Sequence, residues 1–228
     1  MNMSQDVQQR MATHPLFVGM ERSQQNWLFT VGYSIALDKH DYLFRRGEQS
    51  GRLYALLSGH IKLSIPAERG QEKVLEFLSP GDVFGESALL TKHVAITNAQ
   101  ALGPSKLLAF EGKDVMVAVT RVPSFAQQIL TNLSQRVETL FRDMETVSLL
   151  SAAQRVAQYL LRQPRVGNQA RLPFHKRAIA SKLGLQPETF SRSLQHLSAD
   201  GLISVCGARV VIHKPDKLQA MLVLLTRV

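Results

Sequence analysis

Hydrophobic and polar residues alternate along this chain with two different periods. Between about residue 35 and residue 110, short apolar or alternating runs lie between glycines and polar turns. Strands of roughly 4–8 residues with turns about every 8–12 residues are typical of an antiparallel sandwich or small barrel. The runs cover residues 42–44, 53–57, 60–65, 73–78, 83–84 and 106–110, after a short helical piece at 23–29. The pattern predicts a β domain with a helical lead-in.

From residue 123 to residue 147 the period changes, and apolar residues recur alternately four and three positions apart, starting at Ala126. Pro123 suits a first helical turn because its missing N–H has no partner there. A helix packed only on its own domain would also carry an apolar stripe, but three unbroken heptads favour pairing with a second copy. We predict a dimerisation helix whose seam consists of Leu130, Leu133, Val137, Leu140, Met144 and Val147.

The last third of the chain has the pattern of a small helical module. A helix is predicted at 152–161 and is followed by a turn-rich loop. Two short helices, at 176–183 and 187–198, are joined at Gly184, which is the pattern of a helix-turn-helix. Alternating residues at 201–205 and 210–212 predict a two-stranded wing.

Charge separates the same two parts of the chain. Residues 1–150 contain 15 basic and 15 acidic residues, whereas residues 151–228 contain 12 basic and 3 acidic residues, so the whole net charge of +9 lies in the last third. A basic module next to a neutral one is typical of a nucleic-acid-binding protein. We predict a sensor domain at 1–120, a dimerisation helix at 121–149 and a DNA-binding domain at 150–228.

The second helix of the predicted helix-turn-helix has one polar face, which is either an ordinary solvated face or a surface that reads bases. Arg192 offers a fork to guanine, Glu188 can accept from cytosine, and Ser191 can bond either kind of base edge. We predict that these three side chains read DNA bases. Residues that contact the DNA backbone or flank the reading residues are predicted to be Lys176, Arg177, Lys182, Thr189, Gln195 and Arg209.

Composition narrows the class of protein. With 45% hydrophobic and 20% charged residues the chain is globular, and its longest apolar stretches are far shorter than the roughly 20 residues that span a bilayer. The polar first ten residues and the single cysteine, Cys206, predict a cytoplasmic protein without a disulfide or a membrane partner.

A metal-dependent jelly-roll enzyme is the alternative from another functional class, but the sequence contains no His-x-His pair, P-loop or dinucleotide fingerprint. We predict that the chain is not an enzyme.

The predicted order of β domain, long helix and winged helix-turn-helix resembles that of the Crp/Fnr transcription regulators. Two motifs share this resemblance: Gly81-Asp82-Val83-Phe84-Gly85-Glu86 and Leu185-Gln186-Pro187-Glu188-Thr189-Phe190-Ser191-Arg192. The likeness covers essentially the whole chain. It is greatest to the Dnr-type, nitric-oxide-responsive branch, through Gly70-Gln71-Glu72-Lys73, through residues 186–192 and through the lack of cluster cysteines. It implies an α+β fold with an N-terminal cyclic-nucleotide-binding-like β-roll (jelly roll), a long dimerisation helix and a C-terminal winged helix-turn-helix.

The resemblance also implies what the protein binds. The Glu-x-x-Ser-Arg motif formed by Glu188, Ser191 and Arg192 implies a homodimer that activates transcription at TTGAT-N4-ATCAA boxes and contacts RNA polymerase. Pro187 stands where the Crp branch has a base-reading Arg, which argues against that branch's TGTGA half-site.

The effector is less well defined. Relatives that bind cyclic AMP hold its phosphate with an Arg-Ser pair, and the corresponding residues 93–97 here contain no Arg. Gly85 and Glu86 then form a retained turn of the roll, and an effector other than cyclic AMP is expected, although a cyclic-nucleotide-responsive regulator stays open as an alternative. The Dnr likeness implies nitric oxide sensed through haem. No iron ligand is assigned; His14 and His93 lie nearest to where the family places effectors.

Overall fold

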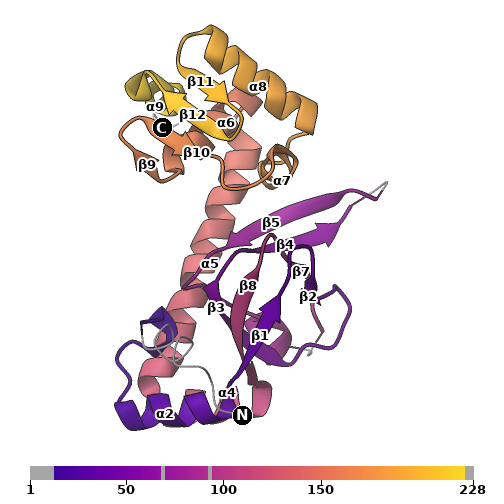
Figure 1. The fold of residues 1–228 in the computed structure, drawn as a ribbon, viewed down its shortest axis with the longest axis vertical. Helices are drawn as coiled ribbons and strands as arrows, with labels where there is room; N and C mark the ends of the chain where they lie inside the picture. The colour runs from indigo at the N-terminus through magenta and orange to yellow at the C-terminus, as the bar shows by residue number, and fades with distance from the viewer. Residues whose placement is uncertain (1–12, 68–69, 92–93, 224–228) are drawn as a thin grey trace. The chain divides into compact units, whose positions relative to one another are not determined.

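The computed structural model describes residues 13–67, 70–91 and 94–223 (Figure 1). The chain forms two compact units, Met1–Val137 and Glu138–Val228. Their border falls inside the long helix α5 (Pro123–Leu149), whereas the sequence suggested borders at the two ends of this helix. The first half of α5 packs in the first unit through Phe125 and Ile129, so the helix belongs in part to each unit.

The first unit is built on two antiparallel sheets with strand orders β1-β8-β3-β6 and β2-β7-β4-β5. Each strand that the sequence predicted is present, and the structure adds β1 and β7. The strands are β1 (Tyr33–Leu37), β2 (Tyr42–Phe44), β3 (Arg52–Ser58), β4 (Ile61–Pro66), β5 (Glu72–Leu78), β6 (Val83–Phe84), β7 (Asn98–Ala101) and β8 (Ser105–Glu111).

Strand β3 shows why the first unit has three layers. Tyr54 and Leu56 lie in the core between the two sheets, whereas Leu53 and Ala55 lie in a second core on the opposite face. Successive side chains of a strand point to opposite faces, so a strand that is buried on both sides must be apolar throughout. The sheet that contains β3 is therefore the middle layer, between the second sheet and a layer of helices.

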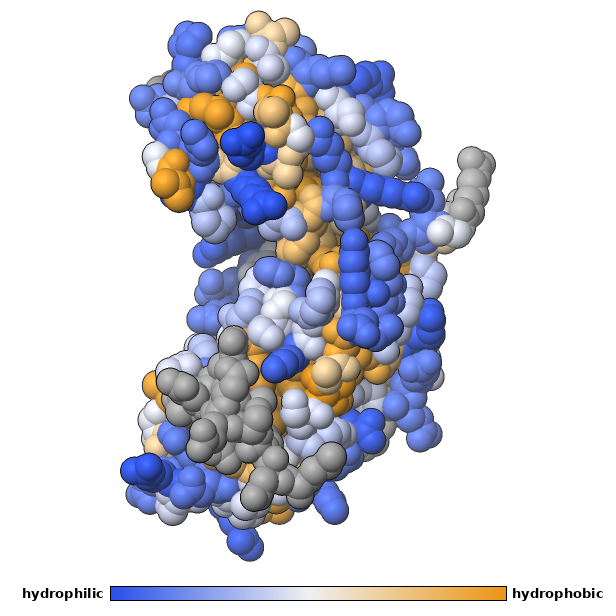
Figure 2. Space-filling model, in the orientation of Figure 1, coloured by the Kyte–Doolittle hydropathy of each residue, from blue (hydrophilic) through white to orange (hydrophobic). Residues whose placement is uncertain are grey.

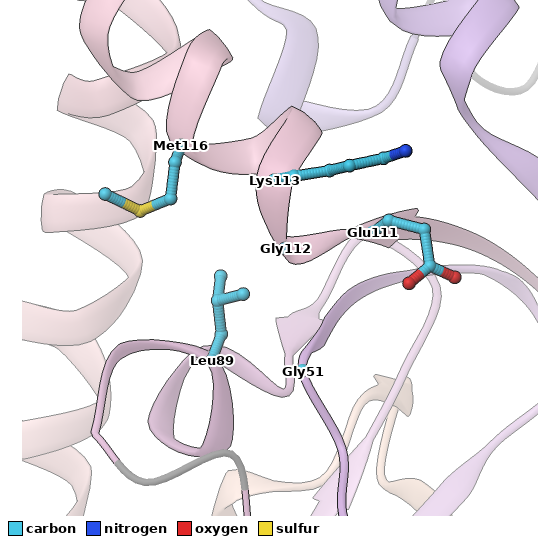
Figure 3. Close-up of a pocket in the computed structure, with 6 residues that line it drawn as sticks. All are labelled: Gly51, Leu89, Glu111, Gly112, Lys113 and Met116. Carbon is cyan, nitrogen blue, oxygen red and sulfur yellow. The ribbon is translucent and has the colours of Figure 1, made fainter.

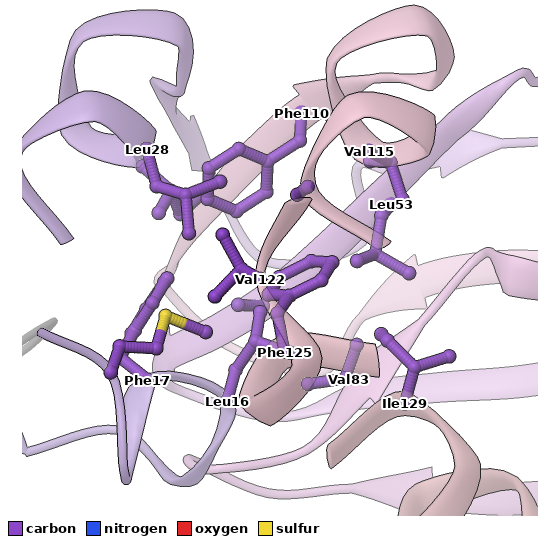
Figure 4. Packing of buried hydrophobic residues seen from close by; sticks show 14 of the residues in the cluster. Leu16, Phe17, Leu28, Leu53, Val83, Phe110, Val115, Val122, Phe125 and Ile129 are labelled. Carbon is purple, nitrogen blue, oxygen red and sulfur yellow. The ribbon is translucent and has the colours of Figure 1, made fainter. Parts of the chain in front are cut away.

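The helical layer covers the second core with parts of the chain that are far apart in sequence. It comprises η1 (Pro15–Phe17), α2 (Arg22–Val31), α4 (Gly112–Arg121) and the first half of α5, while α3 (Glu86–Leu90) follows β6. Leu16, Phe17 and Leu28 converge there on Phe110 and Phe125 (Figure 4). The predicted lead-in helix is α2; the short helices α3 and α4 were not predicted.

The second unit contains the expected helix-turn-helix and wing. Its elements are α6 (Ala152–Arg162), β9 (Arg165–Val166), β10 (Gln169–Arg171), α7 (Lys176–Lys182), α8 (Pro187–Ala199), β11 (Ile203–Cys206), β12 (Arg209–Ile212) and α9 (Pro215–Val223). The wing is wider than predicted because β9 and β10 complete a four-stranded sheet of order β11-β12-β10-β9. Gly167, with φ +58°, allows the tight turn between the two added strands. The predicted α+β arrangement is confirmed.

Candidate nucleic-acid interface

Helix α8 presents the predicted base-reading residues on its outer face. Phe190, Leu194 and Leu197 are buried in the core of the second unit. The side chains of Glu188, Ser191, Arg192 and Gln195 are all exposed, and Thr189 is half-buried. The amphipathic period of the helix thus places a carboxylate, a hydroxyl and a guanidinium group together on its accessible face.

The turn before α8 fixes the angle between the two helices. Gly184 adopts φ +67°, a conformation that favours glycine, and the amide of Leu185 donates to the carbonyl of Ala180 at 2.9 Å. Ile179 and Ala180 of α7 are fully buried in the core that also holds Phe190. Side chains packed this tightly hold α8 in one orientation on α7.

Three of the predicted backbone-contacting cations are accessible. Lys176, Arg177 and Arg209 are exposed, and within the described part of the chain none of them forms an ion pair. In the space-filling view hydrophilic residues cover most of the region that Figure 1 assigns to α6–α9 (Figure 2). Glu188 lies in the first turn of α8, where the helix dipole stabilises an anion.

Lys182 is placed differently from the sequence expectation. Its ammonium group forms an ion pair with the carboxylate of Asp143 in α5, and the two side chains are only 17% and 33% exposed. A cation held by a carboxylate in the protein is a poor phosphate contact, so Lys182 leaves the set of predicted backbone contacts. Nothing in the sequence pairs residues 143 and 182, which lie 39 positions apart and meet only when α7 folds against α5.

The predicted seam of α5 is largely exposed in the single chain. Leu130, Val137, Leu140, Met144 and Val147 are 40–65% exposed. Leu133 instead packs against the core of the first unit, because this turn of α5 lies on the β domain. Phe141, at 66% exposed, was not predicted because it does not follow the heptad spacing. Large apolar side chains left in water along one helix mark an interaction surface.

The turn at Gly85 and Glu86 is held by a residue that the sequence did not suggest. Gly85 has φ +96°, and a Cβ atom there would lie 2.5 Å from the carbonyl oxygen of Arg52, so only glycine fits. The Glu86 carboxylate, 5% exposed, pairs with the guanidinium of Arg136 in α5. Arg136 also contacts Glu76 Oε2 at 3.2 Å and donates to the carbonyl of Val83 at 3.2 Å. The guanidinium of Arg136 is therefore already bound within the protein and is not open to a nucleotide phosphate.

A cavity of about 370 Å³ lies between the roll and α5. It is lined by Pro15, Leu16, Pro80, Gly81, Asp82, Val83, Gln128, Thr131, Asn132 and Gln135. Burial raises the pKa of the Asp82 carboxyl above its usual range. The lining residues include no Lys or Arg, so they offer a phosphate no cationic partner.

A second cavity, of about 570 Å³, lies at the start of α4. Leu89 and Met116 lie on one side of it, and Glu111 and Lys113 lie on the other (Figure 3). The Glu111 carboxylate accepts hydrogen bonds from Arg52 Nε at 2.8 Å and from the Tyr33 hydroxyl at 2.9 Å, and the Arg52 bond in particular lowers the pKa of Glu111. The carboxylate at this cavity is thus already bound within the protein.

The segment at residues 94–97, where the resemblance led us to expect no phosphate ligand, is largely apolar. Ala95 is buried in the core between the sheets, while Ile96 is 62% exposed. The amide of Ala95 donates to the carbonyl of Glu48 at 2.8 Å, which ties this segment to the connection between β2 and β3. His93 lies outside the described residues.

His14 is buried but poorly suited to bind iron in this conformation. Its Nδ1 accepts a hydrogen bond from the amide of Leu16 at 3.1 Å, so in the neutral ring the proton sits on the buried Nε2. Burial lowers the pKa of His14 to about 4. An Nε2 that carries the proton has no lone pair for a metal. Among the described residues no three His, Cys, Asp or Glu side chains gather as a metal site.

No helix in the part of the chain that the structure describes is long and apolar enough to cross a bilayer.

Comparisons with known proteins match both parts of the chain to known domain families. Residues 35–121 match the cyclic nucleotide-binding domain, and residues 154–221 match the Crp-like helix-turn-helix domain. The chain is 26% identical to the cyclic AMP receptor protein of Thermus thermophilus, over 90% of this chain and 95% of that protein.

Two further relatives share a higher identity with this chain. The fumarate and nitrate reduction regulatory protein of Salmonella typhimurium is 30% identical over 81% of this chain and 76% of its own length. The crystal structure of DNR from Pseudomonas aeruginosa is 31% identical, with a TM-score of 0.51, and the match covers 97% of this chain and all of that one. These relatives are regulators and not enzymes, and the chain belongs to the Crp/Fnr family of DNA-binding transcription regulators.

Proposed function

We propose that this regulator is a homodimer that reads TTGAT-N4-ATCAA boxes. The observation that carries the proposal is the outer face of α8, where Glu188, Ser191 and Arg192 are exposed together while the opposite face is buried. Arg can bond guanine with two donors and a carboxylate can accept from cytosine. The three residues therefore provide hydrogen-bonding groups for specific base edges.

A dimer is needed because one short helix reads few base pairs. Two copies related by a two-fold axis present their reading helices to half-sites about one helical turn, or roughly 34 Å, apart. The exposed side chains of Leu130, Val137, Leu140 and Met144 supply an apolar surface on which a second α5 can pack.

A binding comparison tests the proposed box. Full-length protein is titrated onto labelled duplexes that carry an inverted repeat of TTGAT or of TGTGA with equal flanking sequence. We expect tighter binding to TTGAT by roughly a factor of ten or more, because each wrong base pair costs about 1–3 kcal/mol. Tighter binding to TGTGA would refute the proposed box and leave the family assignment intact.

Activation through RNA polymerase is part of the same proposal and follows from the family resemblance. Run-off transcription from a promoter that carries the box should increase when the protein is added to purified polymerase. A decrease at the same promoter would make the protein a repressor there.

We propose further that the effector is not a cyclic nucleotide. Ala95 and Ile96 offer no charge to a phosphate, and the guanidinium of Arg136 is already bound by Glu86 and Glu76. A buried phosphate without a charge-assisted partner would lose much of its hydration energy.

The second candidate is a cyclic-nucleotide-responsive regulator, which the match to the cyclic nucleotide-binding domain favours. Calorimetry with cyclic AMP separates the two. No heat of binding at micromolar concentration is expected, and micromolar binding accompanied by tighter DNA binding would establish the second candidate.

We propose nitric oxide, sensed through haem, as the effector, on the basis of the resemblance to the Dnr-type branch. The conformation of His14 does not fit an iron ligand, so no step of sensing is assigned to it. Absorption spectra of haem-reconstituted protein, with and without nitric oxide, test the proposal. A spectrum identical to that of free haem would exclude haem as the cofactor. An unchanged spectrum in His14→Ala would show that the iron ligand is another residue.

A further inference from the structure

Polar contacts tie the last turns of α5 to helix α7 within the second unit. The Lys182 ammonium on α7 pairs with the Asp143 carboxylate on α5, and both side chains are mostly shielded from water. Ion pairs that are partly withdrawn from water are screened less by salt than exposed pairs. This pair therefore constrains the position of α7 relative to α5 more than a surface pair would.

Arg155 of α6 bridges the ends of the same two helices. Its Nη2 donates to the carbonyl of Val147 at 2.5 Å and its Nε to that of Leu150 at 2.9 Å, at the end of α5. Its Nη1 donates to the carbonyl of Leu183 at 3.3 Å, at the end of α7. The last carbonyls of a helix lack intrahelical partners and carry partial negative charge, so one guanidinium group satisfies both helix ends.

A third contact joins α5 to α6. The Thr146 hydroxyl, in a side chain that is almost fully buried, lies 3.0 Å from Gln158 Oε1 and donates there or to the carbonyl of Arg142. Hydrogen bonds are directional, so a junction of polar contacts holds one relative orientation where an apolar contact would tolerate several. Helix α8 follows this orientation because it packs on α7 through Ile179 and Ala180.

We propose that the Asp143–Lys182 ion pair is a positioning contact that sets the spacing between the two half-sites the dimer can read. The inference rests on the proposed function, because it needs two reading helices joined by paired α5 helices. Neighbouring base pairs are about 3.4 Å apart along DNA. A rotation of α7 on α5 that moved α8 by this distance would place the reading helix one base pair out of register.

The experiment compares spacers of three, four and five base pairs and a single half-site, all bound by full-length protein. The variants are Asp143→Asn, Lys182→Met and the swap Asp143→Lys with Lys182→Asp. Glu145→Gln is the matched control, because Glu145 is an exposed acid two residues further along α5. Arg155→Gln tests the junction without changing either member of the pair, and thermal unfolding by circular dichroism verifies that each variant is folded.

The wild type should bind the four-base-pair spacer roughly tenfold more tightly than the other two spacers. A wrong spacer displaces one reading helix from its half-site, and the loss of a base contact costs about 1–3 kcal/mol. Each single variant, and Arg155→Gln, should reduce this ratio at least threefold or so without changing half-site affinity, and the swap should restore it. Glu145→Gln should keep the wild-type ratio.

A direct phosphate role for Lys182 gives the opposite sign for Asp143→Asn. Removal of an acid near DNA would then strengthen binding to every spacer alike, and Lys182→Met would weaken binding to every spacer alike. That result, or an unchanged spacer ratio in folded Asp143→Asn, overturns the positioning proposal. Failure of the proposed function is seen separately, as wild-type protein that binds the inverted repeat no better than a single half-site or scrambled DNA.

Discussion

At the scale of single residues, the outer face of α8 combines an acid with a cation on the helix that we propose binds DNA. Glu188 would weaken non-specific binding by repulsion from phosphate, so its exposure next to Ser191 and Arg192 favours the proposed contact with a base edge. The α8 face could be predicted from sequence, because helical period alone separates these residues from Phe190 and Leu194. The partners of Lys182 and of Glu86 could not, since each pairing joins residues that are distant along the chain.

Arg192→Ala should weaken binding to the TTGAT box by roughly 1–3 kcal/mol and relax the preference at one base pair. Arg177→Ala is the control, because Arg177 is an equally charged exposed residue predicted to contact only phosphate, and it should weaken binding to all sequences alike. Fluorescence anisotropy with specific and scrambled duplexes measures both. Equal losses on the two duplexes for Arg192→Ala would contradict its base-reading role.

His14 predicts a pH dependence of stability. Its pKa is lowered by burial from 6.5 to about 4, so between these values the unfolded chain binds more protons than the folded chain. The free energy of unfolding should therefore fall as the pH drops from about 6.5 to 4, by roughly 3 kcal/mol from this group. Urea unfolding of the wild type and of His14→Gln at pH 7 and pH 4.5 measures it. A loss that is as large in His14→Gln would assign the effect to other groups.

At the scale of elements, α5 serves both units of the chain. Its heptad period was readable from sequence, and so was its extent, because Pro123 marks its start. The outward position of Phe141 and the partial burial of Leu133 were not readable, since the heptad spacing alone does not show which side chains of the helix pack on other parts of the chain. Strands β1 and β7 were missed for a similar reason: residues 98–101 form a strand through pairing with β2 and β4, not through a strong local pattern.

Leu140→Glu should weaken dimerisation about a hundredfold. The side chain is 51% exposed in the single chain, and burying it in both copies of a paired α5 would contribute roughly 3 kcal/mol. Sedimentation velocity over a range of protein concentrations gives the dissociation constant. Gln127→Glu adds the same charge at an exposed position of α5 outside the seam and should leave the constant unchanged. A dimer that tolerates Leu140→Glu as well as Gln127→Glu would not be built on this seam.

Arg136→Met should lower the stability of the first unit by roughly 3 kcal/mol, because it leaves the buried Glu86 carboxylate without its cation. Adding Glu86→Gln to this variant removes the unpaired charge and should recover much of the loss. Arg142→Met is the control, since Arg142 pairs with Glu138 only at the surface, with both side chains about two-thirds exposed. Denaturant unfolding followed by circular dichroism compares the variants. A loss no greater than that of Arg142→Met would show that the Arg136 contacts carry little stability.

At the scale of the whole molecule, the net charge of +9 lies entirely beyond residue 150, in the unit that carries the helix-turn-helix. Positive charge of this kind gives affinity for any DNA and makes that affinity fall steeply with salt. Sequence specificity has to come from the few side chains of α8 and from the joining of two copies. The regulator family and the charge division were readable from sequence, whereas the junction of α5, α6 and α7 that positions the reading helix appears only in the fold.

The central claim is that two copies of the chain read an inverted repeat through α8. The most direct test is a titration of full-length protein onto TTGAT-N4-ATCAA and onto a scrambled duplex of equal length, with the mass of the complex measured by light scattering. Two chains per duplex and roughly a thousandfold tighter binding to the repeat at physiological salt are expected. One chain per duplex, or equal affinity for the two duplexes, would contradict the account.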